Sequence, residues 1–308
     1  MTYLDPHGIN ADLHSHSTRS DGVLTPEALV ERALANGVEL LALTDHDEVS
    51  GLQAARRRAQ ELGLRFICGV EISVTFAHKT VHIVGLNIDA NNQVLLESLT
   101  AIRTGRTRRA QVMAQGLAEY LNKNTRASSA LAAFQGHLSD EQLAEVIYAG
   151  ALQYAGNPDL ISRTHFARYL VECKLCKHLS DVFLHYLTPD KPGYVETSWA
   201  SLTEAVSWIR QAGGQAVIAH PGRYRFSETE KIALYETFKE LGGEAIEVIT
   251  ASHTREQYSD FVRIAKHFDF LASRGSDFHG PYESRVDLGE VGLLPLLPDS
   301  VIPIWHNW

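Results

Sequence analysis

Two stretches of this chain, residues 9–90 and 201–290, alternate short apolar runs with segments that carry helix signals. Residues 38–43 are a continuous apolar run, as expected of a strand buried on both faces of a parallel sheet. Residues 25–37 begin with Thr-Pro-Glu, which favours a capped helix start, and end with Asn-Gly, which favours a stop. Such alternation is typical of βα units, and the pattern contains about seven of them. Seven strands would form a closed barrel, slightly smaller than the eight-stranded βα barrel.

The same criteria assign the other elements of both stretches. We expect further strands over residues 9–16, 65–74, 80–86, 215–219, 244–249 and 270–273, and further helices over residues 56–62, 201–211, 228–241 and 255–267.

The middle of the chain interrupts this alternation. It contains helix-like segments and no convincing strand; the segments are residues 103–121, 140–149, 162–173 and 179–187. We therefore predict an α/β barrel formed by residues 1–95 and 200–308, with an inserted helical subdomain of residues 96–199. The insertion has a small excess of basic residues, although the formal charge of the whole chain is −9.

Histidine and carboxylate residues stand at or near the ends of the expected strands. His14 and His16 end the first strand, and side chains at i and i+2 of a strand point to the same side. Asp277 and His279 form a second pair with this spacing after the last strand. The complete set of expected metal ligands is His14, His16, Asp21, His46, Glu71, His82, His220, Asp277 and His279. In βα barrels, the carboxyl ends of the strands carry the active site.

Nine ligands are too many for one ion and suit two or three. Nitrogen and oxygen donors without thiolate favour Mn²⁺, with Zn²⁺ or Fe²⁺ as alternatives. The chemistry expected from such a site is metal-assisted hydrolysis, in which the ions lower the pKa of a bridging water and polarise the electrophile.

The ordered set of these motifs, including Asp45-His46 and His220-Pro221, resembles the PHP (polymerase and histidinol phosphatase) superfamily. The resemblance implies a distorted seven-stranded TIM-like barrel with two or three metal ions at its C-terminal face. It implies that His14, His16, Glu71 and Asp277 hold the first ion. It also implies that Glu71 bridges to a second ion, bound by His82 and His220, and that Asp21, His46 and His279 hold a third. Several relatives have histidine where Asp21 stands.

Three further segments, residues 161–167, 191–195 and 219–224, are similar to a bacterial branch of that superfamily, the TrpH or YciV branch, although Thr164 stands where that branch has proline. The similarity implies an inserted helical subdomain and removal of the 3′-phosphate from 3′,5′-nucleoside bisphosphates. It also implies 5′-to-3′ trimming of short RNA.

The insertion would then select the substrate through placed cations. We expect Arg163 and Lys191 to bind a second phosphate, and His165 of the same motif to contact the substrate. Arg223 and His253 would reach the scissile phosphate from the barrel side.

Two carboxylates next to the expected ligands have more than one possible role. Asp45, His253 or a metal-bound water could protonate the leaving group, and the sequence does not choose among them. Asp12 and Asp45 are otherwise candidates to orient the imidazoles of ligands.

Other functions remain as alternatives. They are an exoribonuclease on short RNA, a phosphatase for a metabolite such as histidinol phosphate, and a non-catalytic PHP module. Amide hydrolysis is disfavoured, because no lysine stands at a strand end with suitable neighbours.

The partners we expect are a small nucleotide and short RNA. Net negative charge argues against binding a DNA duplex, and no apolar run reaches the roughly 18 residues of a membrane span. Three cysteines cannot form a disulfide framework and residues 1–12 do not resemble a signal peptide, so we expect a reducing, cytoplasmic location. The oligomeric state does not follow from the sequence.

Overall fold

The computed structural model describes residues 6–124, 138–196 and 199–308. The chain divides into two compact units. The first is formed by Met1–Thr100 and Ser198–Trp308, and the second by Ala101–Thr197. Among the described residues, no helix combines the length and the apolar character needed to cross a membrane.

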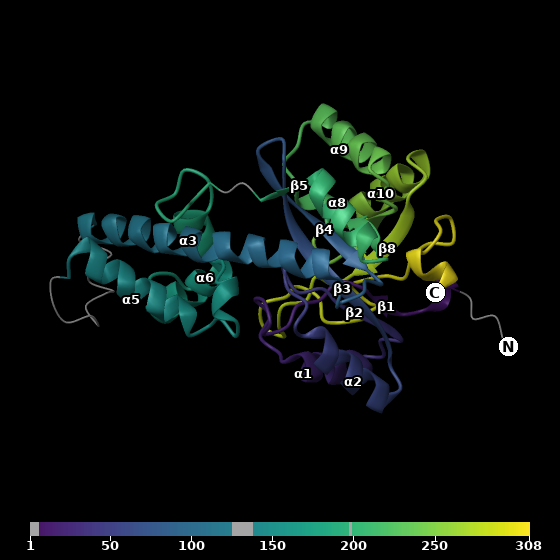
Figure 1. The fold of residues 1–308 in the computed structure, drawn as a ribbon, viewed down its shortest axis with the longest axis horizontal. Helices are drawn as coiled ribbons and strands as arrows, with labels where there is room; N and C mark the ends of the chain where they lie inside the picture. The colour runs from purple at the N-terminus through teal and green to yellow at the C-terminus, as the bar shows by residue number, and fades with distance from the viewer. Residues whose placement is uncertain (1–5, 125–137, 197–198) are drawn as a thin grey trace. The chain divides into compact units, whose positions relative to one another are not determined.

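The first unit is a barrel of seven strands in the order β1-β2-β3-β4-β6-β7-β8, with a short strand β5 that pairs with β3 (Figure 1). The strands are β1 (Ala11–Asp12), β2 (Leu40–Leu43), β3 (Arg65–Phe76), β4 (Lys79–Leu86), β5 (Ala200–Ser201), β6 (Gln215–Ile218), β7 (Ala245–Thr250) and β8 (Leu271–Gly275). The predicted seven-stranded α/β barrel is thus confirmed. Every residue of β2 and β7 is buried, which explains the continuous apolar run of β2 and the mostly apolar sequence of β7.

One strand departs from the predicted parallel arrangement. β4 runs antiparallel to both of its neighbours, β3 and β6, whereas the β1-β2-β3 and β6-β7-β8 pairs are parallel. Only Ala77 and His78 connect β3 to β4, and both have positive φ. So short a connection permits a hairpin and excludes a parallel crossover. The amino-terminal half of β4 therefore lies at the edge where the parallel strands end.

Helices surround this barrel. They are α1 (Pro26–Ala35), α2 (Leu52–Leu62), α8 (Leu202–Gln211), α9 (Glu228–Glu240) and α10 (Arg255–His267). Helix α1 begins at the predicted Thr25 cap, whereas α2 begins at Leu52, before the predicted residue 56. The Thr25 hydroxyl accepts a hydrogen bond from the Ala28 N–H at 3.2 Å, and Ser201, Ser227 and Thr254 form capping boxes. α8 packs against β3, β4 and β6, and α10 against β7 and β8.

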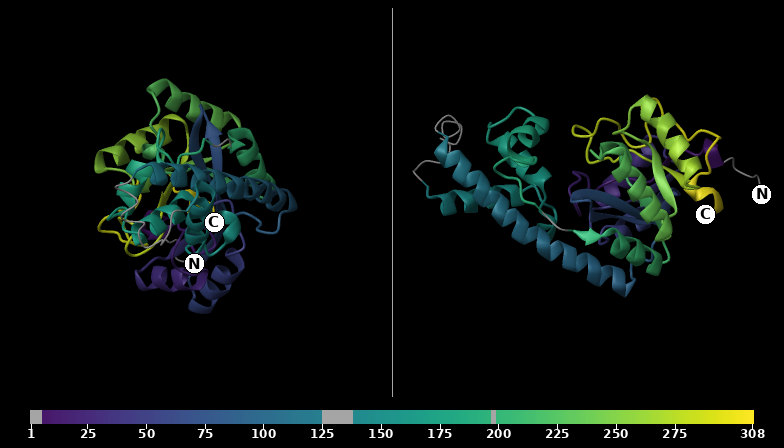
Figure 2. Two further views of the ribbon diagram at one scale, coloured as in Figure 1. Left: turned by 90° about the vertical axis from the view of Figure 1, so that its left-hand side faces the viewer. Right: turned by 90° about the horizontal axis from the view of Figure 1, so that it is seen from above.

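Helix α3 (Gln93–Lys123) begins in the first unit and continues into the second. It starts well before residue 103, where the sequence pattern predicted its beginning. The second unit further contains α5 (Asp140–Leu152), α6 (Arg163–Glu172), α7 (Leu179–Val182) and a π-helical turn, η4 (Phe183–Leu187). Figure 2 shows these helices beside α3. They share a hydrophobic core that includes Leu117, Ile147, Phe166 and Leu170.

Candidate metal centre

The barrel closes at a seam between its first and last strands. The Leu13 N–H donates to the Arg274 carbonyl at 2.9 Å, the Asp277 N–H to the His14 carbonyl at 2.9 Å, and the His16 N–H to the Phe278 carbonyl at 2.8 Å. These backbone hydrogen bonds bring the histidines that follow β1 beside the segment that follows β8. The two pairs with i, i+2 spacing therefore meet although more than 250 residues separate them.

The first cluster consists of His14, His16, Glu71 and Asp277. Glu71 Oε2 lies 3.2 Å from His14 Nε2 and 3.3 Å from His16 Nε2, and Asp277 Oδ1 lies 3.5 and 3.3 Å from these nitrogens. Ligand atoms about 2.1 Å from one ion are about 3.0–3.4 Å apart in octahedral or tetrahedral coordination. The observed spacing therefore suits ligands of a common divalent ion.

Glu71 also reaches a second group of imidazoles. Its Oε1 atom lies 2.9 Å from His82 Nδ1 and 2.9 Å from His220 Nε2, while its Oε2 atom lies 2.9 Å from His46 Nδ1. His82 enters this group because β4 is antiparallel, which places its amino-terminal half at the ligand-bearing edge. Glu71 is shared by the first cluster and by a second one of His46, Glu71 and His82. Its Oε2 atom faces His14, His16 and His46 and its Oε1 atom faces His82 and His220, an arrangement that suits a bridging carboxylate.

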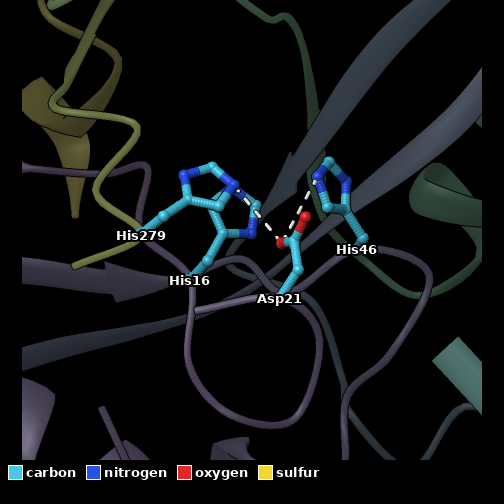
Figure 3. A group of neighbouring side chains, drawn as sticks. All are labelled: His16, Asp21, His46 and His279. Atoms are coloured by element: carbon cyan, nitrogen blue, oxygen red, sulfur yellow. Dashed lines mark ion pairs between the residues drawn. The ribbon is translucent and has the colours of Figure 1, made fainter. Parts of the chain in front are cut away.

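The third cluster contains His16, Asp21, His46 and His279. Figure 3 shows the Asp21 carboxylate between the imidazoles of His279 and His46, with its Oδ1 atom 3.3 Å and 3.8 Å from their Nε2 atoms. The ring of His16 stacks on that of His279 with centroids 4.2 Å apart, so this cluster adjoins the first. The structure thereby brings together all nine residues that the sequence singled out.

Opposite charges balance one another in this buried region. Burial opposes a charge on His16, but the adjacent carboxylates of Asp277 and Glu71 outweigh it and raise the pKa of His16 to about 10. Burial likewise opposes ionisation of Glu71, yet the neighbouring imidazoles hold its pKa well below the usual range. Burial lowers the pKa of His220 to about 3, and the charge of Arg223 acts in the same direction.

Several buried donor atoms of the clusters make no hydrogen bond within the part of the chain that the structure describes. They include His14 Nε2, His16 Nε2 and Glu71 Oε2, which all point into the first cluster. Buried polar atoms normally have partners, so such convergent atoms indicate a site for an ion. Nitrogen and oxygen donors without thiolate fit a divalent metal such as Mn²⁺, Zn²⁺ or Fe²⁺.

One carboxylate of the site was missed by the sequence analysis. Glu247 Oε1 lies 2.7 Å from His14 Nδ1, and Glu247 Oε2 accepts a hydrogen bond from the His220 N–H at 2.5 Å. Its signal in the sequence was a single acidic residue within the apolar run of β7. Charged residues are rarely buried without a partner, so this position could have been identified.

Asp12 and Asp45 accept hydrogen bonds that hold backbone segments in place. In the described part of the chain, none of these hydrogen bonds comes from an imidazole. Asp12 accepts from the N–H groups of Ser276 and Gly289 at 2.8 and 2.9 Å. Asp45 accepts from the Ser17 N–H and hydroxyl at 2.8 and 2.7 Å and from the Ser20 hydroxyl at 2.6 Å. The prediction that Asp12 orients a ligand imidazole is therefore corrected: Asp12 fixes the residue before Asp277. Asp45 fixes the loop between His16 and Asp21 through hydrogen bonds that engage both of its oxygens.

His253 also has a task different from the predicted one. Its Nε2 atom accepts a hydrogen bond from the Gly222 N–H at 3.0 Å, and its Nδ1 atom lies 3.2 Å from the Val248 carbonyl. Burial lowers its pKa to about 4, so the ring is neutral. Backbone groups occupy both nitrogens, and His253 braces the turn after His220 without reaching a phosphate.

Arg223, on that turn, is half-exposed and its Nη1 atom lies 2.8 Å from Asp277 Oδ2.

The remaining candidates belong to the second unit. Arg163 is the first residue of α6, and its guanidinium lies 6.0 Å from the centroid of the Phe183 ring. His165 is fully buried, and its Nδ1 atom accepts a hydrogen bond from the Ser162 N–H at 3.0 Å. His165 is therefore part of the α6 cap, which differs from the predicted contact with substrate. Lys191 is exposed in the turn that follows η4.

Comparisons with known proteins agree with this geometry. The PHP domain family matches residues 12–172. The chain is 44% identical to a 3′,5′-nucleoside bisphosphate phosphatase from Chromobacterium violaceum, covering 97% of this chain and 96% of the relative. It is 38% identical to the 5′-3′ exoribonuclease Rnm from Escherichia coli, covering 96% and 93%. A solved structure of an amidohydrolase from C. violaceum with bound sulfate superposes with a TM-score of 0.81 at 42% identity, covering 97% and 95%.

Proposed function

Because this chain belongs to the PHP domain family, we propose that it is a metal-dependent phosphoesterase that removes the 3′-phosphate from 3′,5′-nucleoside bisphosphates. The observation that carries the proposal is the Glu71 carboxylate, whose two oxygens face five imidazoles at 2.9–3.3 Å. This arrangement supports two or three adjacent divalent ions rather than one. The name of the C. violaceum relative supports the choice of substrate.

His14, His16, Glu71 and Asp277 would hold one ion, His82 and His220 would share Glu71 with a second, and Asp21, His46 and His279 would hold a third. When bound, Mn²⁺ or a similar ion lowers the pKa of a coordinated water and withdraws charge from the phosphoryl oxygens. Asp45, Asp12 and His253 hold the segments next to His16, Asp277 and His220, so the reacting phosphate would meet preorganised groups there.

Arg223 would bind the scissile phosphate. Its guanidinium is half-exposed and lies against Asp277, so a short rotation of the side chain brings it to an anion beside that carboxylate. An arginine suits this role because its N–H groups match two phosphate oxygens at once. The chain offers no free side-chain acid in the first unit among the groups we predicted, since Asp45 and His253 are both engaged. We therefore assign protonation of the leaving oxygen to water.

The helical unit would supply recognition of the second phosphate. Arg163 and Lys191 are the candidates, because both lie in that unit and neither contributes to the three clusters. A bisphosphate would then be distinguished from a simple phosphate ester by charge rather than by the base. Short RNA with a 5′-terminal phosphate presents a similar pair of phosphates, and the exoribonuclease relatives support it as a second candidate substrate.

The first test is phosphate release from 3′,5′-adenosine bisphosphate, with adenosine 3′-monophosphate as control, by protein stripped of metal and reloaded with Mn²⁺. We expect fast release from the bisphosphate and slow release from the monophosphate. Absence of release from both, with Mn²⁺ demonstrably bound, would overturn the assignment in favour of longer RNA, a metabolite phosphate or a non-catalytic role.

The second test concerns the cations of the helical unit. Arg163→Ala should raise KM for the bisphosphate by about tenfold or more and leave KM for an aryl phosphate nearly unchanged. Arg108→Ala, an exposed arginine of the same unit, is the matched control and should change neither value. Equal effects of Arg163→Ala on both substrates would contradict the role in phosphate recognition.

A further inference from the structure

Glu247 is a buried carboxylate that lies outside all three clusters able to hold a metal ion. It is 1% exposed and stands in the middle of β7, where the neighbouring residues are apolar and every position is buried. An ionised carboxylate in such surroundings is costly unless hydrogen-bond donors surround it. In the described chain Glu247 has two such donors, one from His14 of the first cluster and one from His220, whose imidazole contacts Glu71.

The first donor is the imidazole of His14. Its Nε2 atom faces Glu71 and Asp277, and its Nδ1 atom lies 2.7 Å from Glu247 Oε1. A carboxylate can only accept, so this hydrogen bond assigns the proton of neutral His14 to Nδ1. The lone pair of Nε2 then points into the first cluster, where a cation would bind it.

The second donor is the backbone of His220. This residue has φ of 28° and ψ of 56°, an uncommon conformation for a residue with a side chain. Its N–H donates to Glu247 Oε2 at 2.5 Å. That hydrogen bond holds the backbone in the conformation from which the His220 imidazole reaches Glu71.

We propose that Glu247 is a positioning residue that prepares two metal ligands at once, the His14 ring for the first ion and the His220 backbone for the second. The inference rests on the proposed metal dependence and extends it to a residue that does not itself touch an ion. It implies that a single change at Glu247 weakens both ion sites together, whereas loss of one ligand affects chiefly its own site.

Glu247→Gln tests this directly, because an amide keeps the shape but replaces one acceptor by a donor. If the amide NH₂ faces His14, the ring must carry its proton on Nε2 and cannot bind a cation there. If the NH₂ faces His220 instead, two N–H groups oppose each other. Mn²⁺ titration of metal-stripped protein should show affinity lowered by about 10–100-fold, the usual loss when such outer partners of ligands are changed.

Thermal unfolding separates positioning from a purely structural role. A structural role would lower the Tm of the metal-stripped variant and leave the increase in Tm on adding Mn²⁺ unchanged. The proposal expects this increase to be smaller in Glu247→Gln than in the wild type. Glu48→Gln is a matched control, because Glu48 is also a buried carboxylate but accepts hydrogen bonds from the Val49 and Ser50 N–H groups.

Folded Glu247→Gln protein with wild-type affinity and stoichiometry for Mn²⁺ would overturn the inference. Should that variant fail to fold, Glu247→Asp replaces it, since the shorter side chain keeps its charge but cannot reach both donors. Wild-type Mn²⁺ binding by Glu247→Asp would likewise overturn the inference. No substrate is present in these titrations, so the two proposals can fail separately. A wild-type protein that binds Mn²⁺ but releases no phosphate would count against the proposed function and not against the role of Glu247.

Discussion

Glu71 is the residue on which the three clusters depend. It is fully buried in β3, and its two oxygens face histidines that come from both sides of it in the barrel. Without a cation, His14 and His16 supply the compensating charge, because the neighbouring carboxylates raise the pKa of both imidazoles. A divalent ion would displace those protons, so Mn²⁺ binding should release protons and strengthen as pH rises.

Replacing Glu71 by Gln should remove the bridging charge and turn one acceptor into a donor that opposes an imidazole. We expect loss of at least one bound Mn²⁺ per chain and a fall in turnover on the order of 10³-fold. Bound Mn²⁺ and phosphate release should be measured on the same preparation. Glu97→Gln, an exposed change on α3, serves as the control. Full Mn²⁺ occupancy in Glu71→Gln would refute a bridging role.

His253 gives a prediction for the pH dependence of stability. Burial lowers its pKa to about 4 in the folded state, against 6.5 for the ordinary side chain. Below pH 6.5 the unfolded chain takes up a proton that the folded chain does not accept until about pH 4. The contribution of His253 to stability is therefore present at neutral pH and is lost as pH falls through this window.

The comparison with His253→Gln isolates that contribution, because glutamine stays neutral throughout. Between pH 7 and pH 4.5, the free energy of unfolding of the wild type should fall by about 2–3 kcal/mol more than that of the variant. Urea denaturation of metal-stripped protein measures both. Parallel pH profiles would show that folding does not change the pKa of His253.

Among the elements, the β1–β8 seam has tight backbone packing beside the first cluster. Gly275, the last residue of β8, has no room for a methyl group: an added Cβ would collide with the Cβ of His14 and lie 2.7 Å from its backbone nitrogen. Either strand would have to move, and His14 would move with it.

Gly275→Ala should consequently destabilise the protein by about 1–3 kcal/mol and weaken Mn²⁺ binding. Gly105→Ala is a control with the opposite expected sign, because this exposed glycine of α3 has no atom near an added Cβ and alanine favours helix by about 1 kcal/mol. Thermal denaturation with and without Mn²⁺ checks both variants. A seam that accepts the methyl group without loss of Tm would contradict the packing argument.

The elements also show what the sequence could predict and why the remainder required the structure. Helices α1, α8 and α10 were predictable because local capping signals define their ends. The pairing of His14-x-His16 with Asp277-x-His279 was predictable because strand periodicity puts each pair on one side. The direction of β4 was predicted wrongly, although the two-residue connection at Ala77 and His78 was a readable sign of a hairpin.

Contacts between distant residues were beyond local patterns. No spacing in the sequence indicates that Glu247 reaches His14 or that His253 reaches Gly222, because barrel closure and the turn after β6 create these contacts. The start of α3 was missed for a related reason: residues 93–102 have mixed polarity, and Leu95 and Leu99 pack only once the helix is in place.

At the scale of the whole molecule, we expect the two units to have different roles, one in metal binding and the other in substrate discrimination. The eight residues of the three clusters and His220 lie in the barrel unit. Arg163 and Lys191 lie in the helical unit, which has a hydrophobic core of its own. Metal binding should thus be a property of the barrel unit, and discrimination between substrates a property that the helical unit adds.

Hydrogen exchange of the whole protein can test this division. At Mn²⁺ concentrations of about 100 times Kd, each ion adds about 2.7 kcal/mol to the stability of the unit that binds it. Exchange should slow in β1, β3, β6 and β8 and remain unchanged in α5 and α6. Protection that spreads equally to α5 and α6 would show that the two units unfold as one.

The seam between β1 and β8 determines when the candidate metal centre can form during protein synthesis. The first candidate metal cluster combines residues that are far apart in the sequence, His14 and His16 with Asp277. A growing chain therefore cannot assemble this cluster until residue 277 has been synthesised.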